Sequence, residues 1–278
     1  MADQLKALQD KIAENGHDFY FVGIPSQATY HREDYPFYLQ SAIPTADTIR
    51  QKMFSKLDAL QVSYINMEDV FRKEPDKEFF YKTDHHYNFD GAYATYHEII
   101  DRIGQKGLAA VKPPLEREEL DITTLPNPFN GSRNKQIYSM APVSDHLQYA
   151  VPRTEVPYEV WNNHVANTKL YYLPANADTP VTYGVNMGAD WAETIIKTNR
   201  SELPNLLIFG DSFTNAIEPL LYLHFNETRI LDLRHYKEMG LVDYIDKNQP
   251  DVVVMVRDDM NYASFEGNGA FTGQNVKK

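Results

Sequence analysis

Hydrophobic positions recur along the chain with two different spacings, and together they predict a series of helices and strands. Apolar residues three or four positions apart predict amphipathic helices, and short continuous apolar runs predict buried strands. The predicted helices cover residues 5–14, 49–60, 92–100, 213–224 and 241–245. The predicted strands cover residues 19–22, 62–67, 206–209, 229–233 and 252–256.

Strands and helices alternate in the N-terminal third of the chain and again in its C-terminal part. Such alternation is typical of a mostly parallel sheet that is joined by right-handed crossovers and covered by helices on both faces. The run Val252–Val256 is apolar at every position, as expected for a central parallel strand that is buried from both sides. The pattern therefore predicts an α/β fold, a three-layer α/β/α sandwich.

The alternation stops at about residues 109–200, where prolines and loop-forming residues are frequent. Pro113-Pro114 and the run Asn127–Ser132 interrupt any long helix or strand. We expect this stretch to be an insertion or cap over the sheet, rich in loops and short strands. A chain of 278 residues has room for this arrangement as a single domain over residues 1–278.

Composition and charge narrow the range of functions. The net charge of −12 argues against a nucleic-acid partner, because phosphate binding needs clustered Lys and Arg. The absence of cysteine excludes disulfides, a thiolate nucleophile and iron–sulfur clusters. No apolar stretch is long enough to span a membrane, and no signal peptide precedes the first predicted helix. A chain from which an N-terminal membrane anchor had been removed would begin in this way.

The motif Gly210-Asp211-Ser212-Phe213 directly follows a predicted strand and precedes a predicted helix. This position puts the Ser212 hydroxyl at the carboxyl edge of the sheet, where open α/β folds bind ligands. Backbone N–H groups at the start of the helix, that of Ser212 first, would stabilise an oxyanion. The alternative is that Ser212 only caps the helix.

The motif Thr83–Asn88 supplies an acid and a base. In an extended segment Asp84 and His86 point to the same side, so that the carboxylate fixes the tautomer of the imidazole and leaves its other nitrogen to act as a base. His85 would then point away and play a supporting role. We prefer Asp84 to Asp211 as the acid. Asp211 directly precedes Ser212, and the side chain of such a neighbour points away along the turn and more often has a structural role.

The same motif allows a different reading, a divalent metal site. Its ligands would be Asp84, His85 and His86, joined by Asp90 or His97. Adjacent histidines on a strand diverge, however, and no second cluster of carboxylates and histidines stands out in the sequence. The sequence therefore favours a triad that works without a metal ion or cofactor.

Four further residues are candidates for substrate binding. Arg234 comes directly after a predicted strand, at the same sheet edge as Ser212, where it would bind a carboxylate or sugar hydroxyl or form a structural salt bridge. Tyr183 lies in the predicted cap and is a candidate for lining the site. The other two candidates are Asn215 and His85.

These motifs resemble those of a known family. Thr83–Asn88, followed by Gly91–Tyr93, is similar to the signature of the bacterial DHHW protein family, with Tyr87 where that signature has Trp. Leu207–Phe213 and Ile230–Arg234 also fit this family. The family is similar in turn to the SGNH-hydrolase-like O-acetyltransferases of alginate and other exopolysaccharides, in which an Asp-x-His motif and a later Ser form the triad.

The resemblance implies Asp84 as the acid, His86 as the base and Ser212 as the nucleophile. In ordinary SGNH esterases the Ser motif comes first, whereas here the order is reversed, as in the polysaccharide acetyltransferases. The residues expected to assist the Ser212 amide in holding an oxyanion are Gly184, Asn186 or Asn215.

The expected function is therefore O-acyl transfer, most simply O-acetyl transfer, to a cell-surface or secreted polysaccharide through an acyl-Ser212 intermediate. By resemblance, the protein works outside the cytoplasm, is membrane-anchored at full length and receives its acyl group from a membrane-bound acyltransferase partner. Three other functions stay open. They are a carbohydrate esterase, in which water replaces the sugar hydroxyl, a non-catalytic polysaccharide-binding protein and a metal-dependent hydrolase.

Overall fold

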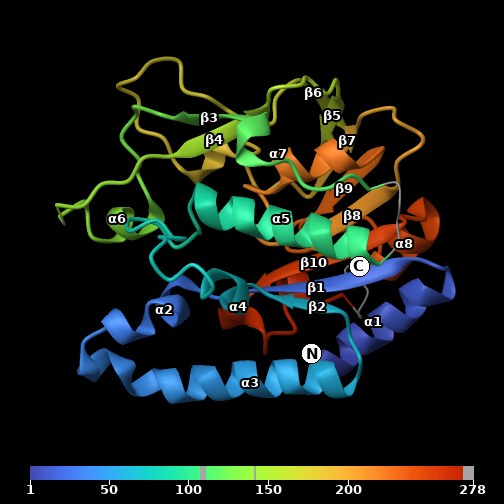
Figure 1. Cartoon of the computed structure of the whole chain (residues 1–278), viewed down its shortest axis with the longest axis horizontal. Coiled ribbons are helices and arrows are strands. Elements are labelled where there is room, and N and C mark those ends of the chain that lie inside the picture. The colour runs from blue at the N-terminus through green and yellow to red at the C-terminus, as the bar shows by residue number, and fades with distance from the viewer. Residues whose placement is uncertain (107–110, 141, 272–278) are drawn as a thin grey trace.

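An eight-stranded sheet forms the centre of the computed structural model, which describes residues 1–106, 111–140 and 142–271 (Figure 1). Across this sheet the strands follow the order β2-β1-β10-β8-β9-β7-β5-β6. The first five are mutually parallel, whereas β7, β5 and β6 each run antiparallel to the strand before them. The strands are β1 (Asp18–Ile24), β2 (Tyr64–Asn66), β5 (Glu159–Asn162), β6 (Val165–Asn167), β7 (Glu193–Lys197), β8 (Asn205–Gly210), β9 (Glu227–Leu231) and β10 (Val252–Asp258).

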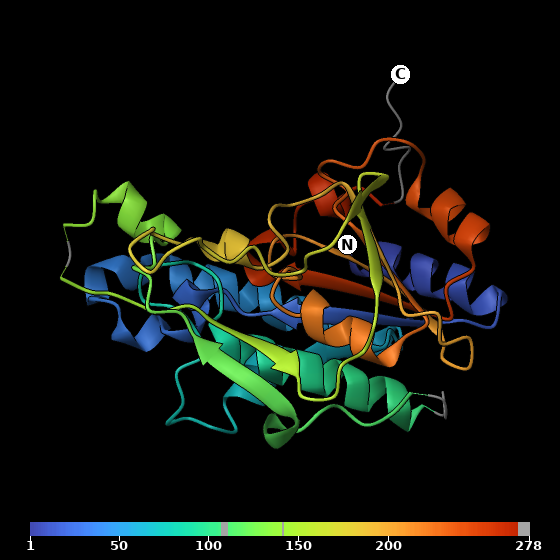
Figure 2. The same cartoon turned by 90° about the horizontal axis from the view of Figure 1, so that it is seen from above.

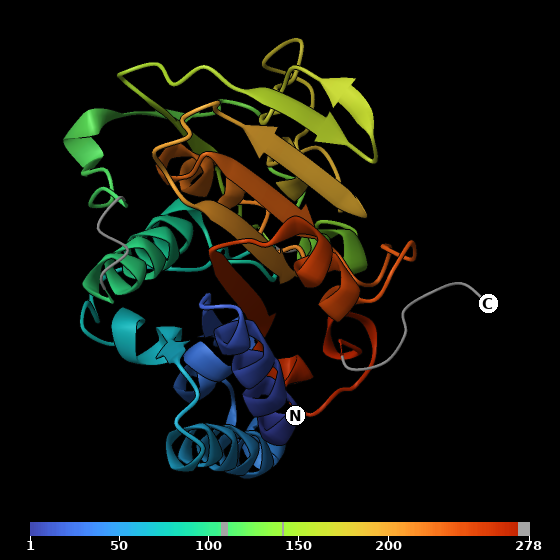
Figure 3. The same cartoon turned by 90° about the vertical axis from the view of Figure 1, so that its right-hand side faces the viewer.

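Helices pack on both faces of the sheet (Figure 3). Apolar side chains of three helices share one hydrophobic cluster with the sheet, and those of three others share the second. The helices of one face are α1 (Ala2–Glu14), α3 (Ile43–Ala59) and α8 (Leu241–Asn248). Those of the other face are α4 (Met67–Phe71), α5 (Phe89–Gln105) and α7 (Glu218–Leu221). The predicted three-layer α/β/α sandwich is confirmed.

The central strand β10 shows why this sheet needs helices on both sides. Val252, Val254 and Val256 belong to the cluster under α5, whereas Val253 and Met255 belong to the cluster under α1. All five side chains are fully buried. Because successive side chains of a strand point to opposite faces, a continuous apolar run must be covered twice.

The helix predicted over residues 213–224 is wrong in its first half. Consecutive turns follow Ser212, and the helix α7 begins only at Glu218. Two side-chain bonds to the backbone hold the turns, from Phe213 N to Asp211 Oδ1 at 3.1 Å and from Thr214 Oγ1 to Asp211 O at 3.0 Å. Short polar side chains compete in this way with helical hydrogen bonds.

The stretch 109–200, expected as a cap, instead divides into two parts. Its second part supplies β5, β6 and β7, which continue the central sheet rather than lying over it. Its first part holds the separate antiparallel pair β3 (Leu120–Thr124) and β4 (Gln148–Pro152), with the short helix α6 (Ser132–Gln136) between them in the chain (Figure 2). Whether the chain is one domain stays a prediction.

A membrane-spanning helix is not found in the described part of the chain, since no helix there combines the necessary length and apolar character.

The short helix α2 (Gln27–Tyr30) follows β1 and lies next to the loops that end the parallel strands. It begins after Ser26, whose side chain accepts a hydrogen bond from Thr29 N. Because β1, β8, β9 and β10 are parallel, the loops that follow them lie at the same edge of the sheet.

We expect the cap of α5 to contribute measurably to stability. The Asn88 side chain accepts a hydrogen bond from Gly91 N at 3.1 Å and donates to Glu78 O at 2.8 Å. Asn88→Ala should lower the free energy of unfolding in urea by about 1 kcal/mol, because a helix N–H loses its partner. Asn88→Ser, which keeps a capping oxygen, should recover most of this loss. Equal losses in both variants would contradict a capping role.

Candidate active site

Two segments that are far apart in the sequence meet in one chain of hydrogen bonds. His86 Nδ1 lies 2.6 Å from Asp84 Oδ1, and His86 Nε2 lies 2.7 Å from Ser212 Oγ. The acid and the imidazole are buried, with 3% and 4% of their surfaces exposed. A carboxylate on one imidazole nitrogen and a hydroxyl on the other is the arrangement in which an imidazole removes the hydroxyl proton.

The loop that carries the acid and the imidazole is not extended, as the sequence analysis assumed. It consists of bends, and Asp84 Oδ1 also accepts a hydrogen bond from His86 N at 3.0 Å. This Asx turn, and not the alternation of a strand, brings Asp84 and His86 to the same side. The prediction that His85 points away is also wrong, because the rings of His85 and His86 lie 3.9 Å apart between centroids.

The start of α6, with Gly131 directly before it, supports the acid from the other side. Ser132 N donates to Asp84 Oδ2 at 2.7 Å, and Arg133 N donates to Thr83 O at 3.0 Å. The two segments approach so closely that a Cβ on Gly131 would lie 2.2 Å from Thr83 O, so only glycine fits there. Burial raises the pKa of Asp84, but the hydrogen bonds from His86 and Ser132 outweigh it and hold this pKa well below its usual range.

Ser212 lies in the turn that follows β8. Within this turn Phe213 N donates to Asp211 Oδ1, Thr214 N donates to Asp211 O and Asn215 N donates to Ser212 O. Among the contacts of the described residues, the Ser212 N–H has no hydrogen-bond partner and is thus free to donate to a bound group. This agrees with its predicted place as the first donor to an oxyanion.

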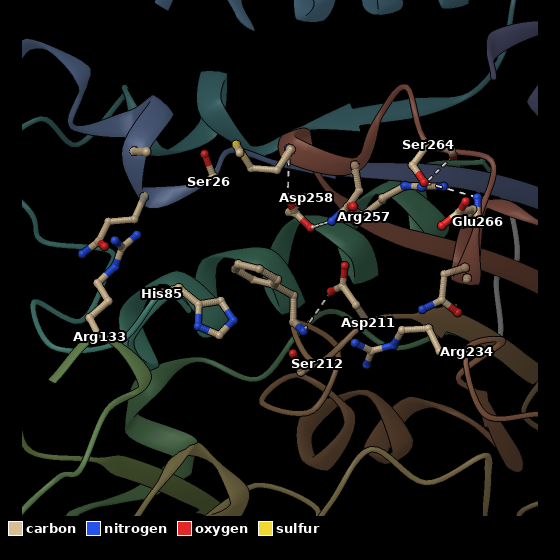
Figure 4. Close-up of a pocket in the computed structure, with 17 residues that line it drawn as sticks. Ser26, His85, Arg133, Asp211, Ser212, Arg234, Arg257, Asp258, Ser264 and Glu266 are labelled. Atoms are coloured by element: carbon tan, nitrogen blue, oxygen red, sulfur yellow. Dashed lines mark hydrogen bonds between the residues drawn. The ribbon is translucent and has the colours of Figure 1, made fainter. Parts of the chain in front are cut away.

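Ser212 opens onto a cavity of about 750 Å³ at the carboxyl edge of the sheet (Figure 4). The hydroxyl lies on one side, beside the ring of His85. Both arginine and carboxyl side chains line the rest of the space, and they are Arg133, Arg234, Arg257, Asp211, Asp258 and Glu266. Most of the polar residues that line it come from the loops after β1, β8, β9 and β10. They include Ser26, Gln27, His85, Arg133, Asp211, Ser212, Arg234, Arg257 and Asp258.

Of the four predicted substrate-binding residues, Arg234 and His85 line the cavity and the other two do not. Arg234 Nη2 lies 2.7 Å from Asp190 Oδ2, and its Nε lies 2.9 Å from Asp232 Oδ1. These contacts with Asp232 and Asp190 raise the pKa of the guanidinium, despite its partial burial. Arg234 thus forms the structural salt bridge that was one of its two predicted roles. It also faces the cavity, as the predicted substrate-binding role requires.

Tyr183 and Asn215 occupy positions behind the cavity. Tyr183 is 6% exposed, and its ring stacks on that of His86 at 3.7 Å between centroids. Asn215 is 7% exposed and donates to Asp190 Oδ1 at 2.9 Å, so it helps to fix the carboxylate that holds Arg234. Each therefore contacts a residue of the site and not the cavity.

Several residues that line the cavity were not predicted from the sequence. Arg257 and Asp258 lie at the end of β10, Ser26 follows β1, and Arg133 lies in α6, whose first residue supports Asp84. The first three could have been found by the strand-end reasoning that was applied to Arg234, because parallel strands end at one edge. Arg133 gave no comparable signal, since only the folded chain brings residues 131–134 to Thr83.

The ligand atoms of Asp84, His85 and His86 lie within 4.8 Å of one another, as a metal site would require. The carboxylate and both ring nitrogens of His86 are already in the hydrogen-bond chain with Ser212, and His85 Nδ1 lies 2.7 Å from Ser132 Oγ. A metal ion could bind only by breaking these contacts, so the donor set does not fit a resident ion. The further ligands suggested from sequence lie elsewhere: Asp90 pairs with Arg117, and His97 contacts Asp101.

Two acids near Ser212, the partly buried Asp211 and the buried Glu218, carry raised pKa values. Burial and the neighbouring Asp258 carboxyl raise the pKa of Asp211 well above its usual range. Burial also raises the pKa of Glu218 to about 8, although the hydrogen bond from Thr214 opposes this. The Glu218 carboxyl is therefore mostly protonated in the folded chain at neutral pH.

Stability should fall with rising pH because of Glu218. Below about pH 4.5 its carboxyl is protonated in both states, whereas between about 4.5 and 8 only the unfolded chain ionises, which favours unfolding. Glu218→Gln should therefore raise the free energy of unfolding by more than about 1 kcal/mol at pH 8.5 and leave it nearly unchanged at pH 4. Urea unfolding at both pH values measures this difference.

The matched control is Glu202→Gln on the exposed surface. This variant should show the same small change at both pH values. A gain in stability for Glu218→Gln that did not depend on pH would contradict a protonated buried carboxyl.

Comparison with known proteins supports this description of the fold. The family model described as SGNH hydrolase-like domain, acetyltransferase AlgX, matches residues 1–160. No protein with a curated description matches the chain. The structure of Bacillus cereus PatB1 with a sulfonyl adduct is 25% identical with a TM-score of 0.75, over 93% of this chain and 87% of that one.

Two further structures share the fold at lower identity. A DHHW family protein from Eubacterium siraeum is 17% identical with a TM-score of 0.73, over 100% of this chain and 89% of that one. The O-acetyltransferase domain of Pseudomonas putida AlgJ is 13% identical with a TM-score of 0.53, over 94% and 84%. The predicted resemblance to the DHHW and SGNH-like acetyltransferase proteins is confirmed.

Proposed function

The chain belongs to the family of SGNH hydrolase-like domains described for the acetyltransferase AlgX, and on this premise we propose that it is a serine-dependent O-acetyltransferase with a polysaccharide acceptor. The observation that carries the proposal is the hydrogen-bond chain Asp84–His86–Ser212 at the wall of a cavity. The family provides the expectation of acetyl transfer, and the geometry provides the groups that such a reaction needs.

In the first half-reaction His86 Nε2 takes the proton of the Ser212 hydroxyl while Oγ attacks the carbonyl carbon of the acetyl donor. The carbonyl oxygen becomes an oxyanion, to which the Ser212 N–H donates a hydrogen bond. When the oxyanion collapses, the bond to the leaving group breaks and the leaving group takes the proton from His86. Acetyl-Ser212 remains, with His86 neutral again.

In the second half-reaction a sugar hydroxyl replaces the leaving group. His86 takes its proton, the sugar oxygen attacks the acetyl carbon, and collapse of the second oxyanion breaks the bond to Ser212 Oγ. Ser212 recovers the proton from His86. Asp84 keeps its negative charge throughout and stabilises the imidazolium that forms in each half-reaction, as its lowered pKa allows.

The likeness to PatB1, whose structure carries a sulfonyl adduct, adds support for a site that reacts covalently. We further propose that the protein acts outside the cytoplasm and receives its acetyl group from a membrane-bound acyltransferase, without a cofactor of its own.

Incubation with p-nitrophenyl acetate should add one acetyl group to the protein, at Ser212. Intact-protein mass spectrometry with peptide mapping measures the adduct. Ser212→Ala and His86→Ala should abolish it, since one lacks the nucleophile and the other its base. Ser201→Ala, an exposed serine outside the cavity, should behave as wild type. An adduct that persists in Ser212→Ala, or that never forms in wild type, would refute the proposal.

Acceptors then separate transfer from hydrolysis. Acetylated wild-type protein should lose its acetyl group faster with an oligosaccharide acceptor than in buffer alone, and the acceptor should gain 42 Da, which is roughly the mass of one added acetyl group. Release at the same rate with and without any acceptor would mark the protein as a carbohydrate esterase.

Asp84→Asn should slow acylation by on the order of 10³-fold, because an amide neither fixes the required tautomer nor stabilises the imidazolium. Stopped-flow release of p-nitrophenol gives the rate constant. The control is Asp121→Asn, an exposed carboxylate on β3, which should keep the wild-type rate. A loss of less than about tenfold for Asp84→Asn would contradict the role given to the carboxylate.

A further inference from the structure

The imidazole of His86 is held between two other rings. The ring of Tyr183 is parallel to it, with 1° between the planes and 3.7 Å between centroids. The ring of His85 lies 3.9 Å away with a tilt of 37°. In the part of the chain that the structure describes, His85 and Tyr183 share no ring contact with each other, so they lie against opposite faces of the imidazole.

The hydroxyl of Tyr183 contributes little to this arrangement. It is buried and has no hydrogen-bond partner among the described residues. Burial holds the pKa of Tyr183 well above its usual range, so the phenol stays neutral and does not exchange protons with the site. What Tyr183 offers to His86 is therefore the face of its aromatic ring.

The segment that carries Tyr183 is firmly anchored. Val181 N donates to Pro128 O at 2.9 Å and Asn130 N donates to Val181 O at 2.7 Å, which fixes this segment to the loop before α6. Tyr183 also packs in a small hydrophobic cluster with Tyr81, Phe129 and other apolar side chains. The ring is thus a rigid surface against which the imidazole rests.

We propose that Tyr183 is a positioning residue that fixes the plane of the His86 imidazole and stabilises it as it becomes a cation. The face of an aromatic ring carries negative charge, and a cation that lies over it within about 6 Å is attracted. A neutral imidazole, the form that acts as a base, gains little from this charge. The attraction grows as the Ser212 proton arrives, so it lowers the barrier to acylation rather than strengthening substrate binding.

His85 closes the opposite face without opposing this charge. Burial first, and then the neighbouring His86, lower the pKa of His85, so its ring is neutral at neutral pH. Its Nδ1 lies 2.7 Å from Ser132 Oγ, and Ser132 N holds Asp84, so the same residue positions the acid and the second ring. The imidazole can then turn in neither direction away from Ser212.

This inference rests on the proposed function and is tested by the rate of acylation in single turnovers with p-nitrophenyl acetate. Tyr183→Leu should lower the acylation rate constant roughly 10-fold or more and leave KM within about twofold of wild type. Tyr183→Phe keeps the ring and should recover the wild-type rate. Since it also removes a buried hydroxyl without a partner, it should unfold at the same temperature as wild type or higher.

The matched control is Phe129→Leu, which removes a buried aromatic ring from the same cluster without touching His86. It should lose stability much as Tyr183→Leu does but keep the wild-type acylation rate. Wild-type acylation in Tyr183→Leu, or an equal loss in Phe129→Leu, would overturn the role of Tyr183 alone. A wild-type protein that forms no acetyl-Ser212 would overturn the proposed function and this role with it.

Discussion

The site depends on the three hydrogen bonds that the Asp84 carboxylate accepts. One oxygen holds both the backbone and the ring of His86, and the other holds the backbone of Ser132. The same carboxylate therefore shapes its own loop, orients the imidazole and holds the first residue of α6. Without this carboxylate, neither His86 nor the start of α6 would have a fixed position relative to Ser212. Ser212 follows β8 and is distant from both of them in the sequence.

Much of this architecture could be predicted from the sequence because it follows from local rules. Apolar periodicity located most of the strands and helices, and the end of β8 located Ser212 at the correct edge of the sheet. The pairing of Asp84 with His86 was predicted for an incorrect reason, since an Asx turn and not a strand aligns them. Spacing alone does not distinguish the two, because both conformations bring residues i and i+2 together.

The rest of the site depends on contacts that the sequence does not reveal. The position of Tyr183 behind His86 arises from tertiary packing of a segment without regular periodicity. The strands β5 to β7 were not predicted as part of the central sheet either, because the prolines of this stretch suggested a loop-rich cap. The turn at Ser212 was missed because the Asp211 and Thr214 side chains replace helical hydrogen bonds, a competition that depends on details of a few atoms.

The sheet begins with β2 and ends with β6, and each of these edge strands is only three residues long. An edge strand exposes unpaired N–H and C=O groups that invite pairing with another chain. Short edge strands leave little backbone for such pairing. The long, strongly apolar strands lie in the centre of the sheet, where both of their edges are already paired. Another extended polypeptide thus finds few backbone partners along the rims of the sheet, which limits association of this protein through its sheet edges.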